Sequence, residues 1–219
     1  MAHRDPIGIN TLTAAILFAP LPARSATFTR YASNGEFDCG TAGKQDSCQF
    51  FCDTTKSSGR TFDCGNAGEC DVQCTSFECL FEATVNASNS NNLNAVAAAE
   101  ECFSNSIVYV PDAGNATLSV TQPLGLMNMD VIAGRNTQNI ILDCVEPSTD
   151  INECKNMDLH AETAQYVEIR SGANAGLTGT SSTFDVWCPV NSSYTGPERA
   201  PCILDLSTGG SMDEVNIHT

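Results

Sequence analysis

Basic residues are scarce in this chain of 219 residues. Only 10 lysines and arginines stand against 26 aspartates and glutamates, so the formal net charge is −16. Proteins that bind nucleic acids or anionic membranes through charge need basic patches. The composition therefore argues against both kinds of partner and suits solubility in a cation-rich exterior.

The motifs of several site classes are also missing. The sequence has no Cys-x-x-Cys pair, no glycine-rich phosphate loop and only three histidines, of which His160 and His218 lie outside the N-terminal segment. Zinc sites need tighter clustering of cysteine and histidine than this. Nucleophilic catalysis needs a base beside a serine or cysteine, and neither histidine lies in a recognisable partner motif. We therefore assign no catalytic residue.

No stretch is apolar enough to cross a membrane, and the N-terminus is typical of a secretory signal peptide at residues 1–25. Arg4 gives a weakly basic start, residues 7–19 are mostly apolar, and Ala23 and Ser25 provide small residues for cleavage. The alternative is an unstructured tail. The signal-peptide interpretation predicts a secreted, extracellular protein.

Cysteine usage agrees with secretion. The number of cysteines, 12, is even and all of them follow the predicted leader, which favours a disulfide framework formed in an oxidising compartment. The predicted disulfide-forming residues are Cys39, Cys48, Cys52, Cys64, Cys70, Cys74, Cys79, Cys102, Cys144, Cys154, Cys188 and Cys202. Their connectivity does not follow from the sequence. Three sequons predict glycosylation at Asn86, Asn115 and Asn191.

Residues 26–92 are predicted to form a small, disulfide-stapled module. They contain a local repeat, because Phe37-Asp-Cys-Gly-Thr-Ala-Gly is followed 25 residues later by Phe62-Asp-Cys-Gly-Asn-Ala-Gly. Each unit is too short to bury a core, so cross-links must hold it. We interpret the module as a cap on the following domain, with an adhesive or spacer module as the alternative. The Asn- and Ser-rich residues 86–94 are the expected linker.

Residues 93–135 predict one helix followed by short strands. Leu93, Val96, Ala97, Cys102 and Phe103 fall on one side at helical spacing, and an alanine run adds helix propensity. A β-branched strand follows at residues 107–110 and ends at Pro111, and further strands follow at residues 117–118 and 131–132.

This order of a helix, V-Y-V-P, A-G, a T-L strand and V-I-A-G resembles the entry to a pectin-lyase-like right-handed parallel β-helix. In that superfamily an amphipathic helix plugs the open end of the solenoid. The resemblance implies a mainly β fold with one N-terminal capping helix, and a β-helix domain at residues 93–219 after the Cys-rich module. Any α+β or β-sandwich domain with one short helix is the alternative.

A three-residue pattern of apolar, acidic and apolar residues recurs through the second half of the chain. In a strand it places the apolar pair inside and the acid outside. The central acids are Asp130, Asp143, Asp158, Glu168, Asp185 and Asp205. A longer echo, in which Leu142-Asp-Cys144 matches Val186-Trp-Cys188 with a shift of 44 to 48 residues, suggests a solenoid unit of one long coil or two ordinary ones.

If such strands stack in register, acids come to lie directly opposite one another, which is unfavourable. Either the acids are spread over a solvated face, or a cation bridges them. Calcium, which prefers oxygen ligands, would then be the natural ion, with the six acids named above as candidate ligands. No other cofactor is expected. Calcium binding predicts a higher melting temperature in millimolar calcium than in chelator.

The motifs of β-helix enzymes are largely absent. Polygalacturonases of the superfamily carry Asn-Thr-Asp, Asp-Asp, Gly-His-Gly and Arg-Ile-Lys motifs, and none of these occurs here. Pectate lyases of similar fold combine an acidic calcium site with a basic catalytic residue, for which Arg135 and Arg170 are the candidates. The resemblance alone therefore leaves an enzyme as the second hypothesis.

The sequence favours a secreted or cell-surface, non-catalytic structural or adhesion ectodomain that binds extracellular glycans or matrix proteins. The alternatives are a polysaccharide lyase or hydrolase of the pectin-lyase-like class and a toxin-like or inhibitory secreted protein. The last residues, 215–219, read as part of a strand. The expectation is either end-to-end self-association or a longer natural chain.

Overall fold

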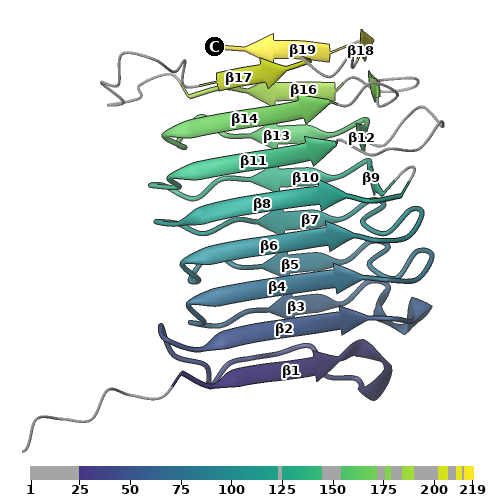
Figure 1. Cartoon of the computed structure of the whole chain (residues 1–219), viewed down its shortest axis with the longest axis vertical. Coiled ribbons are helices and arrows are strands. Elements are labelled where there is room, and N and C mark those ends of the chain that lie inside the picture. Colours follow the sequence, from purple (N-terminus) through teal and green to yellow (C-terminus); the bar gives the residue numbers. More distant parts are fainter. Residues whose placement is uncertain are drawn as a thin grey trace, which may run out of the picture.

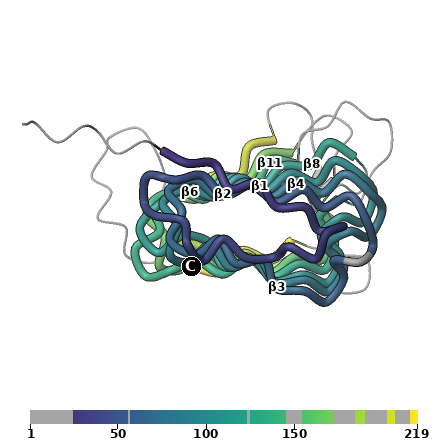
Figure 2. Tube along the Cα trace, turned by 90° about the horizontal axis from the view of Figure 1, so that it is seen from below, coloured from purple at the N-terminus to yellow at the C-terminus, as the bar shows by residue number. Residues whose placement is uncertain are grey.

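The chain forms a β-solenoid of stacked coils, with its N-terminal strand at one end (Figure 1). The computed structural model describes residues 25–122, 125–144, 154–171, 176–178, 184–189, 202–206, 211–213 and 215–219. Strands of successive coils pair in parallel and build three sheets, here named A, B and C. Seen along its axis, the solenoid is flat, with sheets A and B on its two long sides (Figure 2).

Sheet A is the largest and has eight strands. In spatial order they are β1 (Thr27–Tyr31), β2 (Ser47–Cys52), β4 (Glu69–Cys74), β6 (Asn92–Ala97), β8 (Asn115–Val120), β11 (Asn139–Cys144), β14 (Tyr166–Ser171) and β17 (Cys202–Asp205).

Sheet B has seven strands and lies opposite sheet A. They are β3 (Thr61–Asp63), β5 (Thr84–Asn86), β7 (Ile107–Tyr109), β10 (Asp130–Ile132), β13 (Asp158–His160), β16 (Phe184–Trp187) and β19 (Val215–His218). Sheet C joins β9 (Leu126–Met127), β12 (Cys154–Lys155), β15 (Gly176–Thr178) and β18 (Ser211–Asp213).

The core is built from columns of inward-facing apolar side chains. On sheet A the in-register column includes Phe50, Val72, Ala95, Leu118, Leu142 and Ile169. On sheet B it includes Phe62, Val85, Val108, Val131, Leu159 and Val186. All of these side chains are buried. Because neighbouring strands lie about 4.8 Å apart, each coil packs its apolar residues directly on the next coil.

The predicted alternation of apolar and acidic residues is confirmed. Met129, Val131, Met157 and Leu159 are buried, whereas the acids between them, Asp130 and Asp158, face outward and are partly exposed. The strands predicted at residues 107–110, 117–118 and 131–132 are also present, in β7, β8 and β10.

The predicted helix from Leu93 is wrong, because residues 92–97 form strand β6. Leu93, Ala95 and Ala97 are buried and alternate with outward residues, so the true period is two. β4 and β8 lie on either side of β6 and satisfy its backbone hydrogen bonds. This tertiary context overrides the helix propensity of the alanines. The described residues contain two short 3-10 helices, η1 (Ala32–Asn34) and η2 (Thr55–Ser57), and none long and apolar enough to cross a membrane.

Residues 26–92, expected to be a separate cap, contribute strands β1 to β5 to the same sheets as the later strands. β4 pairs with β6 over six residues, so the register continues across the expected boundary. The local repeat within this region is a coil repeat, because Asp38 bridges to Asp63 and Cys48 lies opposite Cys70.

The longer echo of 44 to 48 residues is not a structural repeat. It matched Leu142 in sheet A with Val186 in sheet B, whereas the in-register partners of Leu142 are Leu118 and Ile169. Coil length varies along the chain: corresponding positions are 22 residues apart between β2 and β4 but 27 apart between β11 and β14.

Disulfides occur along the solenoid, and the twelve cysteines are all buried or half-buried. Short local links join Cys39–Cys48, Cys64–Cys70, Cys144–Cys154 and Cys188–Cys202. Cys74 lies at bonding distance from both Cys79 and Cys102, and Cys52 is a buried thiol. The predicted signal peptide, apart from Ser25, and the sequon at Asn191 lie outside the described residues.

Candidate functional site

Two rows of outward side chains run along sheet B, one from each outward-facing position of its strands. The first, here named the acidic row, consists of Asp130, Asp158, Asp185 and Asn216, which lie opposite one another in register. At a strand spacing of about 4.8 Å, three like charges stand directly beside one another. The sequence predicted that acids would lie opposite one another if the strands stacked in register. The strands that carry Asp130, Asp158 and Asp185 do stack in this way.

Two residues further along each strand lies the second row, here named the aromatic row: Tyr109, Ile132, His160, Trp187 and His218. The His160 and Trp187 rings stack with centroids 4.3 Å apart, and those of Trp187 and His218 are 4.8 Å apart. The ring planes are within 11° of parallel, so the rings form a continuous stack along the solenoid. Their nitrogen-bearing edges can meet a ligand lying on the face.

The two rows are joined at Asp185. His218 Nε2 lies 2.8 Å from Asp185 Oδ1, and Asn216 Nδ2 donates to the same oxygen at 3.1 Å. The face therefore combines carboxylate acceptors with ring nitrogens and an amide. This chemistry can hydrogen-bond to hydroxyl groups at regular intervals.

Burial and the like charges of Asp130 and Asp185 raise the pKa of Asp158, with desolvation the larger cause. His160 acts in the opposite direction, but more weakly. Asp158 therefore holds its negative charge less readily than an isolated aspartate.

A cleft of about 260 Å³ adjoins the first members of the aromatic row. Tyr109 and Ile132 line it, together with Asp112 and Arg135 from the turns that follow β7 and β10. Tyr109 is 39% exposed. The cleft brings Arg135, one of the two basic candidates, beside the aromatic row.

The other basic candidate, Arg170, lies on sheet A and is held by acids. Its Nε donates to Glu168 Oε1 at 2.8 Å, and its Nη1 lies 3.8 Å from Asp143 Oδ2. The hydrogen bond to Glu168 is the main cause that raises the pKa of Arg170. In register, Arg170 lies between Asp143 and Asp205, so its guanidinium occupies the place of a bridging cation in that column.

The six candidate calcium ligands therefore fall into two groups. Asp130, Asp158 and Asp185 lie on sheet B, whereas Asp143, Glu168 and Asp205 surround Arg170 on sheet A. Among the residues that the structure describes, only Cys74, Cys79 and Cys102 form a group of three potential ligands with donor atoms within 4.8 Å of one another. Calcium binding by the acidic row stays a prediction, and the melting experiment tests it.

Two of the predicted glycosylation sites lie on outward faces. Asn86 is on sheet B beside Tyr109 and bonds through Nδ2 to Asp63 Oδ1 at 3.4 Å. Asn115 is on sheet A, where its Nδ2 donates to Asn92 and its Oδ1 accepts from Asn139. A glycan on Asn115 would replace a hydrogen of the donor that bonds to Asn92, whereas a glycan on Asn86 would border the aromatic row.

The aromatic row was missed in the sequence, although a signal for it was present. The apolar–acid–apolar pattern stopped one residue too early: read one residue further, the strands become Asp-Val-Ile132, Asp-Leu-His160, Asp-Val-Trp187 and Asn-Ile-His218. A ring recurs two residues after Asp158, Asp185 and Asn216. Because outward positions recur with a period of two, these side chains lie on the same face as the acidic row.

Comparison of the chain with protein-family models, curated proteins and solved structures finds no match.

Proposed function

We propose that this protein is a secreted or cell-surface, non-catalytic ectodomain that binds a polysaccharide along the outward face of sheet B. The observation that carries the proposal is that the acidic row and the aromatic row run side by side along sheet B, each in register from strand to strand. Both rows repeat with the strand spacing of about 4.8 Å. A polysaccharide is itself a periodic chain of hydroxyl groups, so successive sugars can meet equivalent acceptors and ring edges.

Charge narrows the class of glycan. Three aspartates on the face and a net charge of −16 repel uronate-rich or sulfated chains. A neutral polysaccharide avoids this repulsion, and an amino-bearing one gains attraction. The proposed ligand is therefore a neutral or amino-bearing glycan.

The disulfides are compatible with an oxidising, extracellular setting. The parallel solenoid is also compatible with the resemblance to pectin-lyase-like β-helices. An extracellular protein of this shape would be exposed to the polysaccharides that surround cells.

Binding is tested with a panel of neutral, amino-bearing and uronate oligosaccharides, measured by calorimetry on the wild type and on Trp187→Ala. We expect neutral or amino-bearing members to bind the wild type, and the substitution to weaken binding by about tenfold or more. The matched control is Tyr31→Ala, which removes another outward aromatic, stacked on Phe51 at 5.6 Å, but from sheet A. It should bind like the wild type.

Equal losses in both variants would contradict a site on sheet B, and so would binding restricted to uronates. Unfolding of each variant is followed in parallel, so that a loss of fold is not read as a loss of binding.

A carbohydrate-active lyase or hydrolase is the second candidate. It is favoured by the cleft that brings Arg135, Asp112 and Tyr109 together beside the aromatic row. Arg170 is the weaker catalytic candidate, because Glu168 and Asp143 already hold its guanidinium. Turnover of any oligosaccharide in the panel, lost in Arg135→Ala, would establish the enzyme. Binding without turnover would leave the ectodomain.

A further inference from the structure

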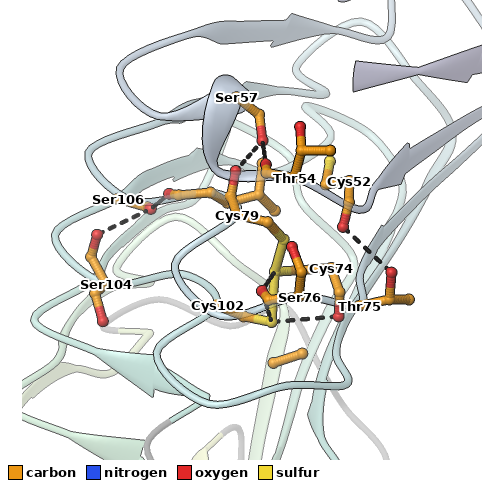
Figure 3. Close-up of a disulfide and its surroundings, with 12 residues drawn as sticks. Cys52, Thr54, Ser57, Cys74, Thr75, Ser76, Cys79, Cys102, Ser104 and Ser106 are labelled. Carbon is orange, nitrogen blue, oxygen red and sulfur yellow. Dashed lines mark hydrogen bonds between the residues drawn. A yellow bond between two sulfur atoms is a disulfide. The ribbon is translucent and has the colours of Figure 1, made fainter. Parts of the chain in front are cut away.

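Four buried cysteines gather at one corner of the solenoid, where strands of sheet A end (Figure 3). Cys52 and Cys74 are the last residues of β2 and β4. Cys79 and Cys102 lie in the turns that follow β4 and β6. The Cα atom of Cys74 is 6.0 Å from that of Cys79 and 5.8 Å from that of Cys102, and both separations suit a disulfide.

A sulfur atom forms only one disulfide at a time, so the two partners of Cys74 are alternatives. Pairing with Cys79 links two residues of the same coil. Pairing with Cys102 links one coil to the next. The partner of Cys74 also determines which cysteines remain available to pair with Cys52.

The repeat of the solenoid relates the four residues in pairs. Cys52 lies opposite Cys74 in the register of β2 and β4. The amide of Ala87 donates to the carbonyl of Tyr109, and the residue before Ala87, Asn86, is the register partner of Tyr109. In the same way the amide of Leu80 donates to the carbonyl of Cys102 at 3.0 Å, and the residue before Leu80 is Cys79. Cys79 therefore lies opposite Cys102.

It follows that a step back by one coil carries Cys74 onto Cys52 and Cys102 onto Cys79. The same step carries a Cys74–Cys102 link onto a Cys52–Cys79 link of similar separation. The short helix η2, which follows Cys52, contacts the turn that contains Cys79, because the Ser57 hydroxyl donates to the carbonyl of Cys79 (Figure 3).

The same-coil alternative leaves two thiols that cannot combine. If Cys74 bonds to Cys79, Cys52 and Cys102 remain two coils apart, or about 10 Å at the usual strand spacing. That separation exceeds the reach of a disulfide. Direct links between register partners, Cys52 with Cys74, are also unsuitable, because parallel side chains on adjacent strands keep their Cβ atoms about 4.8 Å apart.

We propose that the mature protein contains two inter-coil disulfides, Cys52–Cys79 and Cys74–Cys102. This pairing uses all four cysteines and completes the set of twelve. Each bond forms from two thiols, which release two protons and pass two electrons to a disulfide-bearing oxidant, such as a protein disulfide or glutathione disulfide. That oxidant is reduced to two thiols.

A same-coil Cys74–Cys79 bond can convert to this state without a further oxidant for its first step. The Cys102 thiolate attacks Cys74 Sγ, the Cys74–Cys102 bond forms, and Cys79 leaves as a thiolate. Cys79 and Cys52 are then both thiols in neighbouring coils, and the oxidant joins them. Burial raises the pKa of the Cys52 thiol, with the charge of Asp53 a smaller cause, so Cys52 is a poor attacking group and serves as the last partner.

The two bonds would differ from the four short links elsewhere. Those links join residues 6 to 14 apart in sequence, whereas Cys74 and Cys102 are 28 apart. Inter-coil bonds would tie three successive coils together at one corner, independently of the hydrogen bonds of sheet A.

The pairing is tested by alkylating free thiols in denaturant at acid pH and digesting the unreduced wild-type protein with trypsin and a glutamate-specific protease. The proposal predicts that peptide 79–82 is linked to peptide 45–56 and peptide 102–135 to peptide 70–78, with no alkylated cysteine. A link between 79–82 and 70–78, with Cys52 and Cys102 alkylated, would overturn it. A link between 45–56 and 70–78 would do the same.

Thiol counting on Cys52→Ser gives a second, independent readout. Under the proposal the substitution raises the number of free thiols from none to one. Under same-coil pairing it lowers the number from two to one. The matched control is Ser58→Ala, an exposed position in the neighbouring turn, which should leave the count unchanged.

Discussion

The outward faces of sheets A and B stack their side chains in the same way but partner them differently. On sheet A a row of amides bonds head to tail: Asn92 donates to Glu69 at 2.8 Å, Asn115 to Asn92 at 2.9 Å, and Asn139 to Asn115 at 2.5 Å. An amide carries both a donor and an acceptor, so a column of asparagines satisfies itself. Carboxylates carry only acceptors, so the three aspartates of the acidic row on sheet B cannot bond to one another in this way, and the one amide of that row, Asn216, donates to Asp185.

The same contrast holds for charge. Where acids stack on sheet A, Arg170 lies between Asp143 and Asp205. In the acidic row of sheet B, Asp158 lies between Asp130 and Asp185, and the neighbouring rings are those of His160 and Trp187. The comparison indicates that sheet A carries the stabilising ladder. On sheet B, His218 and Asn216 contact Asp185, whereas the like charges of its neighbours raise the pKa of Asp158, and this outward-facing run of acids and rings agrees with the proposed binding face.

The largest expected effect concerns the ends of the sheet A strands. If Cys74 bonds to Cys102, Cys102→Ser removes a link that closes a 28-residue loop, and the free energy of unfolding should fall by about 3–4 kcal/mol. If Cys102 is instead a free thiol, the substitution only exchanges a buried thiol for a hydroxyl and should cost clearly less, about 1–2 kcal/mol. Denaturant unfolding under non-reducing conditions measures the difference. Oligosaccharide binding by sheet B should persist in conditions where the variant is folded.

A second effect concerns the amide ladder. Asn115→Ala removes a donor to Asn92 and an acceptor for Asn139. Both neighbours are half-buried, so each loses a hydrogen bond that water replaces only in part. We expect a loss of about 1–3 kcal/mol in the free energy of unfolding, with glycan affinity unchanged. Urea denaturation and calorimetry test the two parts.

The control for this variant is Asn94→Ala, on the same sheet but exposed, whose side chain donates one longer bond to Asp71 at 3.3 Å. Its loss should be clearly smaller. Equal losses for the two variants would show that the ladder contributes nothing beyond ordinary surface contacts.

The smallest effect has the opposite sign. Asp158→Asn removes the central charge of the acidic row, so it should stabilise the protein by a few tenths of a kcal/mol at neutral pH. In the matched substitution on sheet A, Asp71→Asn, a donor NH2 group replaces one of the two carboxylate oxygens that accept from Gln49 and Asn94, so this variant should be destabilised. Stabilisation by both substitutions would mean that overall charge, not the row, is responsible.

The pH dependence of Asp158→Asn sharpens the same point. The pKa of Asp158 is raised in the folded protein, so the folded state holds this proton more tightly than the unfolded chain does. Asp158 therefore contributes to the wild-type free energy of unfolding at acid pH. This contribution is lost as the pH rises from the ordinary aspartate pKa, about 3.9, through the raised pKa. The advantage of the variant should vanish at acid pH and appear over that interval. An advantage that is constant with pH would contradict a charge effect.

Much of the fold follows from the sequence because a strand has a period of two. The pattern Met129-Asp-Val131 and its repeats give the inward and outward faces of sheet B correctly. Residues 92–97 were misread because alanine favours helices locally, whereas the neighbouring strands that decide the outcome are more than twenty residues away in sequence.

Register was the harder part of the site. Coils of unequal length prevent a fixed repeat from aligning Asp158 with Asp185, and the echo that we found joined strands of different sheets. Once register is known, the aromatic row and the cleft beside Arg135 follow directly. Side chains such as His160 and Trp187 carry no local motif, because their partners come from other coils.

The most direct test uses Trp187, the only tryptophan in the chain. Its fluorescence reports on the stacked part of the aromatic row, where Trp187 lies between His160 and His218. Titration with neutral or amino-bearing oligosaccharides should change the emission saturably and protect the ring from iodide quenching, with the same affinity that calorimetry gives. An oligosaccharide that binds by calorimetry while the emission and quenching of Trp187 stay unchanged would place binding elsewhere and contradict the account.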